Sequence, residues 1–370
     1  MLLKKLIIIP IILYTLTVSA YAAEIPSVSA QSAVLINAET KEVLFEKNAY
    51  SRRSMASTTK IMTCLLAVES GRLSDVVTVG DIFSEGSSIG LKKDYELTLE
   101  ALTYGMMLES GNDAAIVCAE FLSGSEKAFS ESMNKKAKDI GMLNTNFVTA
   151  SGLDSQEHYS TAYDMALLGA KAIENPIFRE MCSTKTKRVD FIKPDLTVTF
   201  SNHNKLLSWC DDVFGIKTGF TKKSGRCLVT AAERDGTVLI AVTLNAGDDW
   251  NDHRKLYNYG FDKCKVNEVY IRLPASLRVY SGYENSLDIA LENNPVKISF
   301  ADSKKITQKI YLPDFVYAPI KQGEIVGRAE LYKDNKRICS YNIKAQSDID
   351  SVPPLPENKS IWWKFADLFK

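Results

Sequence analysis

Hydrophobic residues between positions 57 and 140 recur with the period of an α-helix, in segments separated by short polar stretches. The first segment carries a stripe of apolar side chains and ends before Gly71, a common C-terminal stop. The last segment opens with Ser125 as N-cap and closes at Gly141. The pattern predicts a block of helices covering residues 57–70, 98–109, 112–123 and 125–140.

Other parts of the chain alternate with the two-residue period of β-strands. Residues 32–50 form two short β-type runs around a polar turn, and residues 226–244 form a hairpin pattern whose turn is Asp235-Gly236. A further strand is expected over residues 213–218. Because strands flank the helical block at both ends, we expect a sheet assembled from distant segments and covered by helices, in an α/β fold of the α+β type.

The character of the chain changes after residue 262. From about residue 266 to residue 345, short β-type runs alternate with turns and no long helical period is present, which predicts a small all-β domain. Pro353, Pro354 and Pro356 then indicate an extended linker. The expected divisions after a leader of residues 1–23 are 24–262, 263–347 and 348–370.

The two termini indicate export and membrane association. Residues 1–23 combine Lys4 and Lys5 with a short apolar stretch and an Ala-x-Ala site, as in a cleaved signal peptide. Residues 359–370 place apolar side chains on one broad helical face, which is typical of a helix lying in the bilayer interface. The alternative for this segment is a tail that docks on its own protein. We therefore expect an exported protein, peripherally bound to the outer face of the cytoplasmic membrane.

Composition narrows the expected partners. Forty-five basic residues balance forty-five acidic ones, and no basic stretch is interleaved with aromatic residues, so nucleic acid is not an expected partner. The seven cysteines include no Cys-x-x-Cys pair and the three histidines form no metal-binding cluster, so we expect neither a metal nor another cofactor. The odd cysteine count leaves at least one thiol outside any intrachain disulfide, and the sequence does not select a pairing.

Candidate chemistry begins with Ser57 and Lys60, at the start of the first predicted helix. Residues three apart share a helix face. A serine hydroxyl becomes a good nucleophile when a base accepts its proton, and a lysine can act as that base if burial or a second cation keeps it neutral. Ser132 and Lys135 repeat this spacing on a highly charged helix, where a solvated surface is expected. The spacing alone is therefore a weak signal.

Two further motifs follow in order along the chain. Ser110-Gly111-Asn112 lies at the break between two predicted helices, and Lys217-Thr218-Gly219 lies on the strand that leads to the Asp-Gly hairpin. The Ser-x-Asn form occurs elsewhere, at residues 132–134 and 340–342, whereas Lys-Thr-Gly occurs once. The three motifs in this order are those of β-lactamases and penicillin-binding proteins.

With these motifs the chain resembles the low-molecular-weight penicillin-binding proteins of the serine D-Ala-D-Ala carboxypeptidase family. The Ser-Gly-Leu-Asp segment at 151–154 and the segment at 158–164 also resemble that family, as do the β-rich second domain and the C-terminus. The resemblance implies a penicillin-binding/β-lactamase-like transpeptidase domain with an antiparallel sheet. It also implies peptidoglycan pentapeptide stems as substrates, in a growing wall or a spore cortex, and β-lactam antibiotics as inhibitors.

The resemblance further implies catalytic roles for three motif residues. Ser57 attacks the carbonyl of the penultimate D-alanine and becomes the acyl-enzyme, and Lys60 takes its proton. Ser110 relays a proton toward the leaving amine. These steps together release the terminal D-alanine.

Substrate-binding roles follow from the same resemblance. Asn112 holds Lys60 and the substrate amide by hydrogen bonds. Lys217 and Thr218, with Gly219 on the same strand, meet the terminal carboxylate. The main-chain N–H groups of Ser57 and Phe220 form the oxyanion hole, a suitable use of donors that are fixed before the reaction begins.

The sequence also departs from the family pattern. Many relatives carry histidine where this chain has Ser151, and some carry histidine at the position of Phe220, so a deacylation role for histidine at these positions is absent. The nearest candidate for an additional carboxylate-binding arginine is Arg254. Its other interpretation is a solvated residue of the helix around Asp252 to Tyr259.

Two other functions compete with the carboxypeptidase. A class A β-lactamase shares the three motifs, but it is a single domain with a Glu-containing loop, and here Glu157 lacks that context. A catalytically idle cell-wall-binding protein would keep the fold without needing intact Ser57, Lys60, Ser110 and Lys217. Release of D-alanine from a pentapeptide distinguishes these functions from a carboxypeptidase.

Overall fold

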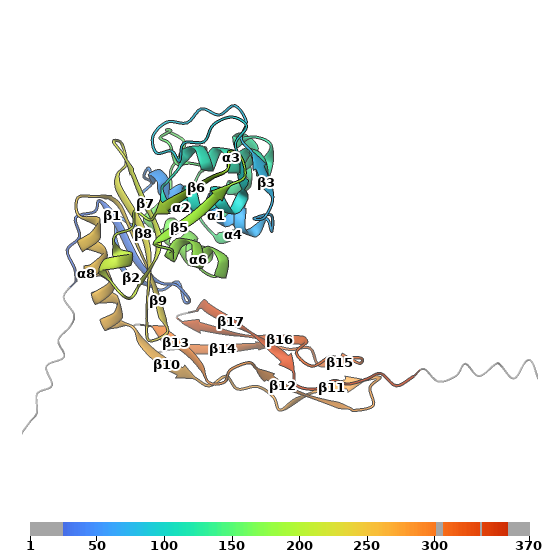
Figure 1. Ribbon diagram of the computed structural model, residues 1–370. Coiled ribbons are helices and arrows are strands. Elements are labelled where there is room, and N and C mark those ends of the chain that lie inside the picture. Colours follow the sequence, from blue (N-terminus) through green and yellow to red (C-terminus); the bar gives the residue numbers. More distant parts are fainter. Residues whose placement is uncertain (1–24, 301–305, 334, 354–370) are drawn as a thin grey trace, which may run out of the picture.

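A five-stranded antiparallel sheet forms the centre of the N-terminal domain in a computed structural model that describes residues 25–300, 306–333 and 335–353 (Figure 1). The strand order is β2-β1-β9-β8-β7. The N-terminal strand β1 pairs along its whole length with β9, which lies ~200 positions later in the chain. The expected sheet built from distant segments is therefore present. Its strands are β1 Ser32–Asn37, β2 Val43–Lys47, β7 Val213–Thr221, β8 Gly225–Arg234 and β9 Thr237–Ala246.

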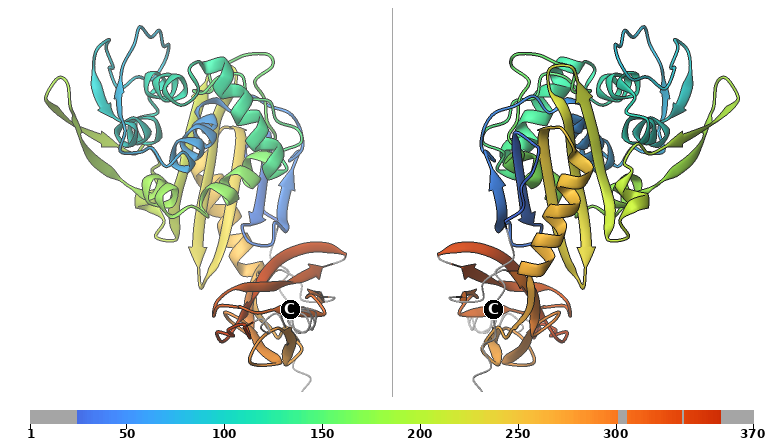
Figure 2. Two further views of the ribbon diagram at one scale, coloured as in Figure 1. Left: turned by 90° about the vertical axis from the view of Figure 1, so that its right-hand side faces the viewer. Right: turned by 90° about the vertical axis from the view of Figure 1, so that its left-hand side faces the viewer.

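Helices cover both faces of this sheet (Figure 2). Alternate residues of β1 point to opposite faces: Val34 joins the core under the helical block, whereas Leu35 joins the core under α8. Both faces are thus buried, which explains why the middle of β8 and most of β9 are apolar. The helices are η1 Ala56–Thr59, α1 Lys60–Glu69, α2 Leu99–Leu108, α3 Asn112–Ser123, α4 Glu126–Ile140, α5 Ala162–Ala172, α6 Pro176–Ser183, α7 Leu206–Trp209 and α8 Asp249–Lys263.

Most predicted elements are present, with shifted ends. The helix expected over 57–70 is a short 3₁₀ turn followed by α1, and the strand expected over 213–218 continues to Thr221. Several elements were not predicted: two hairpins with short or exposed strands, and the helices α5, α6 and α7. The hairpins are β3 Val76–Thr78 with β4 Glu96–Thr98, and β5 Thr186–Phe191 with β6 Leu196–Ser201.

The C-terminal domain is all β, as expected. A six-stranded sheet has the order β14-β16-β17-β12-β11-β15, and β10 pairs separately with β13. Leu287, Leu331 and Ile343 are fully buried in its core. The strands are β10 Lys265–Val269, β11 Ser276–Tyr280, β12 Ser286–Leu291, β13 Val296–Phe300, β14 Ile306–Tyr311, β15 Phe315–Tyr317, β16 Ile325–Lys333 and β17 Lys336–Ala345.

Backbone pairing in this domain extends beyond residue 347. Ile349 bridges Ile320, and Ser351 bridges Gly282, although the sequence pattern assigned residues 348–356 to the linker. These residues can pair because the first proline of the linker is Pro353, and the preceding residues keep their backbone donors. Pairing therefore continues up to the prolines.

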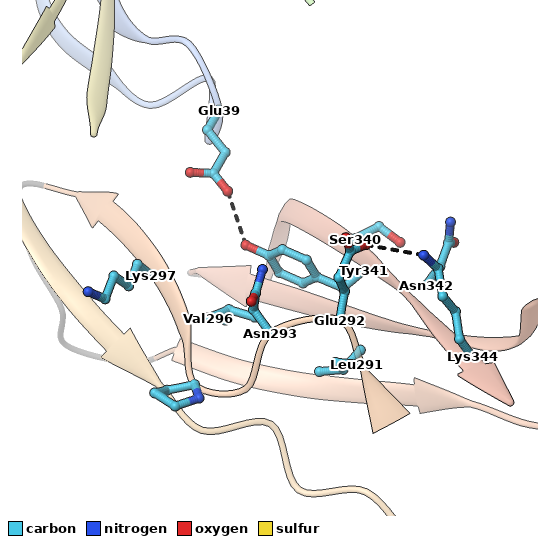
Figure 3. A pocket seen from close by; sticks show the side chains of 11 residues that line it. Glu39, Leu291, Glu292, Asn293, Val296, Lys297, Ser340, Tyr341, Asn342 and Lys344 are labelled. Atoms are coloured by element: carbon cyan, nitrogen blue, oxygen red, sulfur yellow. Dashed lines mark hydrogen bonds and ion pairs between the residues drawn. The ribbon is translucent and has the colours of Figure 1, made fainter. Parts of the chain in front are cut away.

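The two domains touch at the turn between β1 and β2. Tyr341 of β17 donates to Glu39 at 3.0 Å, and Lys333 of β16 forms an ion pair with Glu42 at 2.5 Å. Figure 3 shows Glu39 and Tyr341 facing each other beside a cavity of about 620 Å³ lined mostly by β12, β13 and β17 residues. Burial raises the pKa of Glu39, opposed by the hydrogen bond from Tyr341.

The described part of the chain holds no helix with the length and apolar character needed to cross a bilayer. The predicted signal peptide and the predicted interfacial helix lie outside the described residues. No disulfide joins any of the seven cysteines, and no group of metal-ligating side chains occurs among residues 25–300, 306–333 and 335–353.

Candidate active site

Ser57 lies in the 3₁₀ turn that leads into α1, at the junction between the helical block and β7. Met55 and Ala56 before it are fully buried, and Ala56 has a left-handed backbone with φ 48°. Such a conformation is costly for a residue with a Cβ, so surrounding contacts must hold the turn. Thr58 provides one of them, because its hydroxyl donates to the carbonyl of Met55 at 2.6 Å. The Ser57 side chain remains partly accessible at the surface of this buried turn.

Lys60 is the first residue of α1 and is completely buried. Its Nζ lies 2.9 Å from Ser57 Oγ, 2.6 Å from Asn112 Oδ1 and 2.7 Å from the carbonyl oxygen of Ser151. Asn112 Oδ1 and the carbonyl of Ser151 can only accept hydrogen bonds. A neutral amine has two N–H donors and one lone pair, so its two donors satisfy these oxygens and its lone pair is left facing the Ser57 hydroxyl. The geometry therefore fits a general base.

The surroundings also favour the neutral amine. Burial lowers the pKa of Lys60 well below its usual range, the charge of Lys217 lowers it further, and Asp113 acts in the opposite direction. Desolvation is the largest of these causes. The nearby second lysine thus reinforces an effect that the protein interior already produces.

The loop between α2 and α3 brings Ser110 and Asn112 to the same place. Ser110 has a left-handed backbone with φ 63°, and its side chain lines the cleft beside Ser57. Asn112 opens α3, and its Nδ2 donates to the carbonyl of Glu85 at 2.5 Å, which directs Oδ1 toward Lys60. The next residue, Asp113, accepts hydrogen bonds from the backbone of Ile89 at 3.1 Å. The loop around residues 85–91 is therefore tied to the start of α3.

Strand β7 supplies the opposite wall. Lys217 is buried and its Nζ donates to the carbonyl of Thr218 at 3.1 Å, while Thr218 and Gly219 line the cleft. The pKa of Lys217 is lowered to about 7, because the effect of burial is larger than the opposing effect of the nearby Glu109 carboxylate. The structure thus places all the residues predicted from the sequence in one cleft or directly behind it: Ser57, Lys60, Ser110, Asn112, Lys217, Thr218, Gly219 and Phe220.

Backbone contacts bring the two walls together. A Cβ at Gly219 would lie 3.0 Å from the main-chain nitrogens of Ser57 and Thr58, so β7 approaches the nucleophile turn more closely than a larger residue allows. A Cβ at Gly152 would lie 2.0 Å from the carbonyl oxygen of Ala56. Gly152 also has φ 90°, so glycine is required there on two grounds. These contacts fix the backbone of the turn from two sides.

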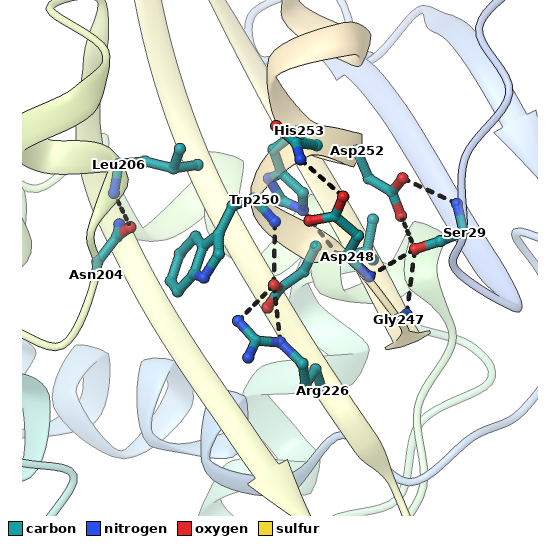
Figure 4. Close-up of polar contacts among 12 residues, drawn as sticks. Ser29, Asn204, Leu206, Arg226, Gly247, Asp248, Trp250, Asp252 and His253 are labelled. Carbon is teal, nitrogen blue, oxygen red and sulfur yellow. Dashed lines mark hydrogen bonds and ion pairs between the residues drawn. The ribbon is translucent and has the colours of Figure 1, made fainter.

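Several cleft residues were not predicted from the sequence. Arg226 of β8 pairs with Phe220 across the strands, and its Nε donates to the buried Asp249 at 2.8 Å (Figure 4). Trp250 packs over the guanidinium at 5.4 Å, and His203 lies 3.3 Å from Glu109. No local spacing identifies these residues, since they come from β8, α8 and the loop before α7. The cleft has a volume of about 460 Å³ and is lined by Ser57, Ser87, Ser110, His203, Thr218, Gly219, Phe220, Arg226, Asp249 and Trp250.

Arg254, the arginine considered from the sequence, is elsewhere. It lines a separate pocket with Trp209 and Cys210. The look-alike pair also differs from the site: Ser132 is exposed on α4, and its hydroxyl bonds only to the carbonyl of Ala128 among the described residues. Spacing alone therefore does not distinguish a buried pair from a solvated one.

The segment around Ser151 has no histidine facing the nucleophile. Ser151 Oγ is buried without a hydrogen-bond partner in the described structure. His158 is buried beneath it, where Nε2 lies 2.8 Å from the hydroxyl of Thr59 and Nδ1 accepts from the main chain of Val148 at 3.0 Å. Burial lowers the pKa of His158 to about 4. His158 therefore positions the segment as a neutral side chain.

The fold and this cleft define a serine acyl-transfer enzyme of the penicillin-binding type, in which lysine rather than histidine contacts the nucleophile. Comparison with known families supports the same class. Residues 19–248 match the family model for D-alanyl-D-alanine carboxypeptidase, and residues 265–351 match the model for the C-terminal domain of penicillin-binding protein 5. The chain belongs to the D-alanyl-D-alanine carboxypeptidase family, and the resemblance inferred from the sequence is confirmed.

Individual relatives match over most of their length. The chain is 31% identical to D-alanyl-D-alanine carboxypeptidase DacF of Bacillus subtilis, over 91% of this chain and 90% of that protein. It is 33% identical to DacC of Escherichia coli, over 88% of this chain and 86% of that protein. The crystal structure of penicillin binding protein 5 from Haemophilus influenzae matches with a TM-score of 0.65 at 29% identity, covering 88% of this chain and 99% of that chain.

Proposed function

We propose that this protein is a serine D-Ala-D-Ala carboxypeptidase that removes the terminal D-alanine from peptidoglycan pentapeptide stems. The observation that carries the proposal is the environment of Lys60 Nζ, which lies within 3 Å of Ser57 Oγ and of two oxygens that can only accept. Family membership indicates the reaction. The geometry indicates which groups perform it.

In the acylation step, Lys60 accepts the proton of Ser57 while Oγ attacks the carbonyl of the penultimate D-alanine. The main-chain N–H groups of Ser57, close to Gly219, and of Phe220, the next residue of β7, stabilise the developing oxyanion in this proposal. Ser110 passes a proton to the nitrogen of the departing D-alanine. The C–N bond breaks, and an ester to Ser57 remains.

In the deacylation step, Lys60 takes a proton from the water that attacks this ester, the bond between the acyl carbon and Ser57 Oγ breaks, and Oγ regains a proton. His203 also lines the cleft, but its Nε2 lies beside the Glu109 carboxylate at 3.3 Å, whereas Lys60 Nζ lies 2.9 Å from Ser57 Oγ, so Lys60 and Ser110 carry the protons in this proposal. The same groups therefore serve both halves of the reaction. A β-lactam enters the first step as a mimic of the dipeptide and leaves a slowly hydrolysed ester on Ser57.

The substrate carboxylate binds at the end of the cleft formed by β7 and β8. Lys217 supplies a buried positive charge and Thr218 a hydroxyl. Arg226 offers a second cation, held by the buried carboxylate of Asp249 and packed on Trp250. A charge whose orientation is already fixed loses less conformational freedom on binding. Arg226 is thus a substrate-binding residue in this proposal, in place of Arg254.

The test is mass spectrometry of a pentapeptide or of muropeptides incubated with the mature protein. Loss of one D-alanine, giving tetrapeptide stems, is the expected result. A second incubation with a primary amine acceptor detects transfer instead of hydrolysis. Recovery of intact pentapeptide, together with labelling by penicillin, would reject the carboxypeptidase while keeping the acylation chemistry.

We further propose that the exported chain is held at the outer face of the cytoplasmic membrane by residues 359–370. The support is the sequence pattern, in which the apolar residues share one face and charged residues occupy the other. Twelve residues are too few to span a bilayer, which needs about 20. Removal of residues 357–370 should move the protein from the membrane fraction to the soluble fraction, and an unchanged membrane fraction would contradict the anchor.

A further inference from the structure

Strands β11 and β15 lie at the end of the C-terminal domain that is remote from the N-terminal domain (Figure 1), and they carry an exposed aromatic cluster. The rings of Tyr280, Phe315 and Tyr317 lie within 5.0 to 6.2 Å of one another, centroid to centroid. Their residues are 43%, 40% and 65% exposed, respectively. We call these three residues the aromatic tip. Single exposed aromatic residues are common, but three in mutual contact on one surface indicate a binding function.

Strand register explains why the three rings share a face. The edge strand β15 pairs in parallel with β11, which sets Tyr317 beside Tyr280 and Phe315 beside Arg278. The alternate residues of β11, Leu277 and Val279, are buried in the domain core. Because side chains alternate along a strand, the tip residues and Arg278 must all point away from that core. Arg278 forms no ion pair in the part of the chain that the structure describes.

The chain leaves the described structure next to this cluster. Val352 donates to the carbonyl of Ser281 at 2.8 Å, directly after Tyr280, and Ser351 bridges Gly282. Lys359, where the proposed interfacial segment begins, lies only six positions after Pro353. Six residues span at most about 20 Å. The tip therefore cannot lie far from whatever surface residues 359–370 occupy.

We propose that the aromatic tip is a second membrane contact, which inserts its rings among the lipid head groups beside the C-terminal segment. The proposal rests on the proposed anchoring by residues 359–370. Tyrosine is enriched at the bilayer interface, where the ring meets acyl chains and the hydroxyl meets water. Arg278 is placed to meet lipid phosphates. One weak interfacial element gives marginal binding, and stable attachment commonly needs a second.

A second copy of the chain is a less suitable occupant. A specific dimer interface needs about 20–30 residues on each side, and the tip supplies three aromatic residues, two on the short edge strand β15 and one on β11. A bilayer needs no such area, because it adapts to the shape of the protein. The geometry therefore favours a lipid surface.

The experiment measures binding of the mature full-length protein to sucrose-loaded vesicles of phosphatidylglycerol and phosphatidylcholine by co-sedimentation. Tyr317→Ser, and the combined change of all three tip residues to serine, should lower the partition coefficient, the combined change by about tenfold. Tyr317→Trp should keep or raise it, because tryptophan also prefers the interface. Tyr270→Ser is the matched control, since Tyr270 is 68% exposed on the same domain but outside the cluster.

The outcomes separate the tip from the anchor and from the enzyme. Vesicle binding equal to that of the unchanged protein in both serine variants would overturn the tip proposal, as would a tip-dependent dimer seen by analytical ultracentrifugation. Deletion of residues 357–370 tests the anchor independently in the same assay. D-alanine release from a soluble pentapeptide should remain unchanged in every tip variant, so loss of that activity reports misfolding and rejects the variant as a probe.

Discussion

Lys60 Nζ and Asn112 Oδ1 lie 2.6 Å apart, although the two residues are separated by 52 positions and belong to different helices. This contact joins the nucleophile turn to the loop between α2 and α3. It holds the amine in place after burial has removed its water. The proposed base is therefore oriented by the helical block and made neutral by its interior.

Replacement of Ser57 by alanine should abolish both penicillin labelling and D-alanine release, because no other hydroxyl lies within bonding distance of Lys60 Nζ in the described structure. Ser132→Ala should retain both activities, since Ser132 is exposed on α4. Labelling with a fluorescent penicillin followed by peptide mapping measures the outcome. A label on any serine other than Ser57 would falsify the assignment.

The acylation rate should depend on pH through two lysines. It rises as Lys60 loses its proton, at a pKa well below that of a free lysine, because burial disfavours the charged amine. It falls as Lys217, with a pKa of about 7, loses the charge that attracts the carboxylate. The second-order acylation constant plotted against pH should therefore be bell-shaped.

Lys217→Arg tests the falling limb of this profile. An arginine stays charged over the whole range, so the decrease on the alkaline side should disappear even if the variant binds less well overall. The rising limb, which belongs to Lys60, should remain. A profile that is flat for the unchanged protein would exclude Lys60 as the base.

Lys217→Ala should weaken capture of carboxylate-bearing substrates while Ser57 and Lys60 stay intact. Loss of a charged partner in a cleft costs roughly 2–4 kcal/mol, on the order of a hundredfold in acylation efficiency. The matched control is Lys223→Ala, because Lys223 is exposed just beyond the same strand. Equal losses in the two variants would show a general charge effect instead of a specific contact.

Arg226→Gln should raise the KM for the pentapeptide roughly tenfold, because the variant removes an oriented cation from the cleft. Arg254→Gln is the control, since Arg254 lines a different pocket. Steady-state kinetics on both variants measure the contrast. A larger increase in KM for Arg254→Gln than for Arg226→Gln would indicate that Arg254, and not Arg226, contacts the substrate carboxylate.

Gly152→Ala should destabilise the protein and impair acylation together, because its Cβ would lie 2.0 Å from the carbonyl oxygen of Ala56 in the nucleophile turn. The expected loss is roughly 2–5 kcal/mol. Gly141→Ala separates strain from crowding: Gly141 also has a left-handed φ, 92°, but nothing lies within 4 Å of its Cβ position. That control should lose only about 1–2 kcal/mol in thermal or urea unfolding.

The sequence predicted the reacting groups better than the cleft that surrounds them. Ser57 and Lys60 share one helical turn, so their relation could be read locally, and the order of the three motifs supplied the rest. His203, Arg226 and Trp250 meet only when a loop, β8 and α8 come together in three dimensions. The spacing of these residues along the chain does not show that they are neighbours in the folded protein. Residue type alone also led to Arg254, which faces another pocket.

The larger elements followed the same rule. The helices over 98–109, 112–123 and 125–140 and the Asp235-Gly236 hairpin carry strong local patterns, and the structure has them. The pair β3 and β4 has strands of three residues each, too short to show a period. Ser351 and Val352 pair with a turn ~70 positions earlier in the chain, and the local composition does not reveal this pairing.

The close approach at Gly219 makes the reaction depend on main-chain groups, whereas substrate preference depends on the side chains around the cleft. The proposed oxyanion donors belong to the main chain, so exchanging one side chain cannot delete them. Phe220, Arg226 and Trp250 surround the same opening through their side chains and can change without altering those donors. Related enzymes can therefore change their peptide specificity while keeping the same reaction, provided that residue 219 stays small enough for β7 and the nucleophile turn to approach each other.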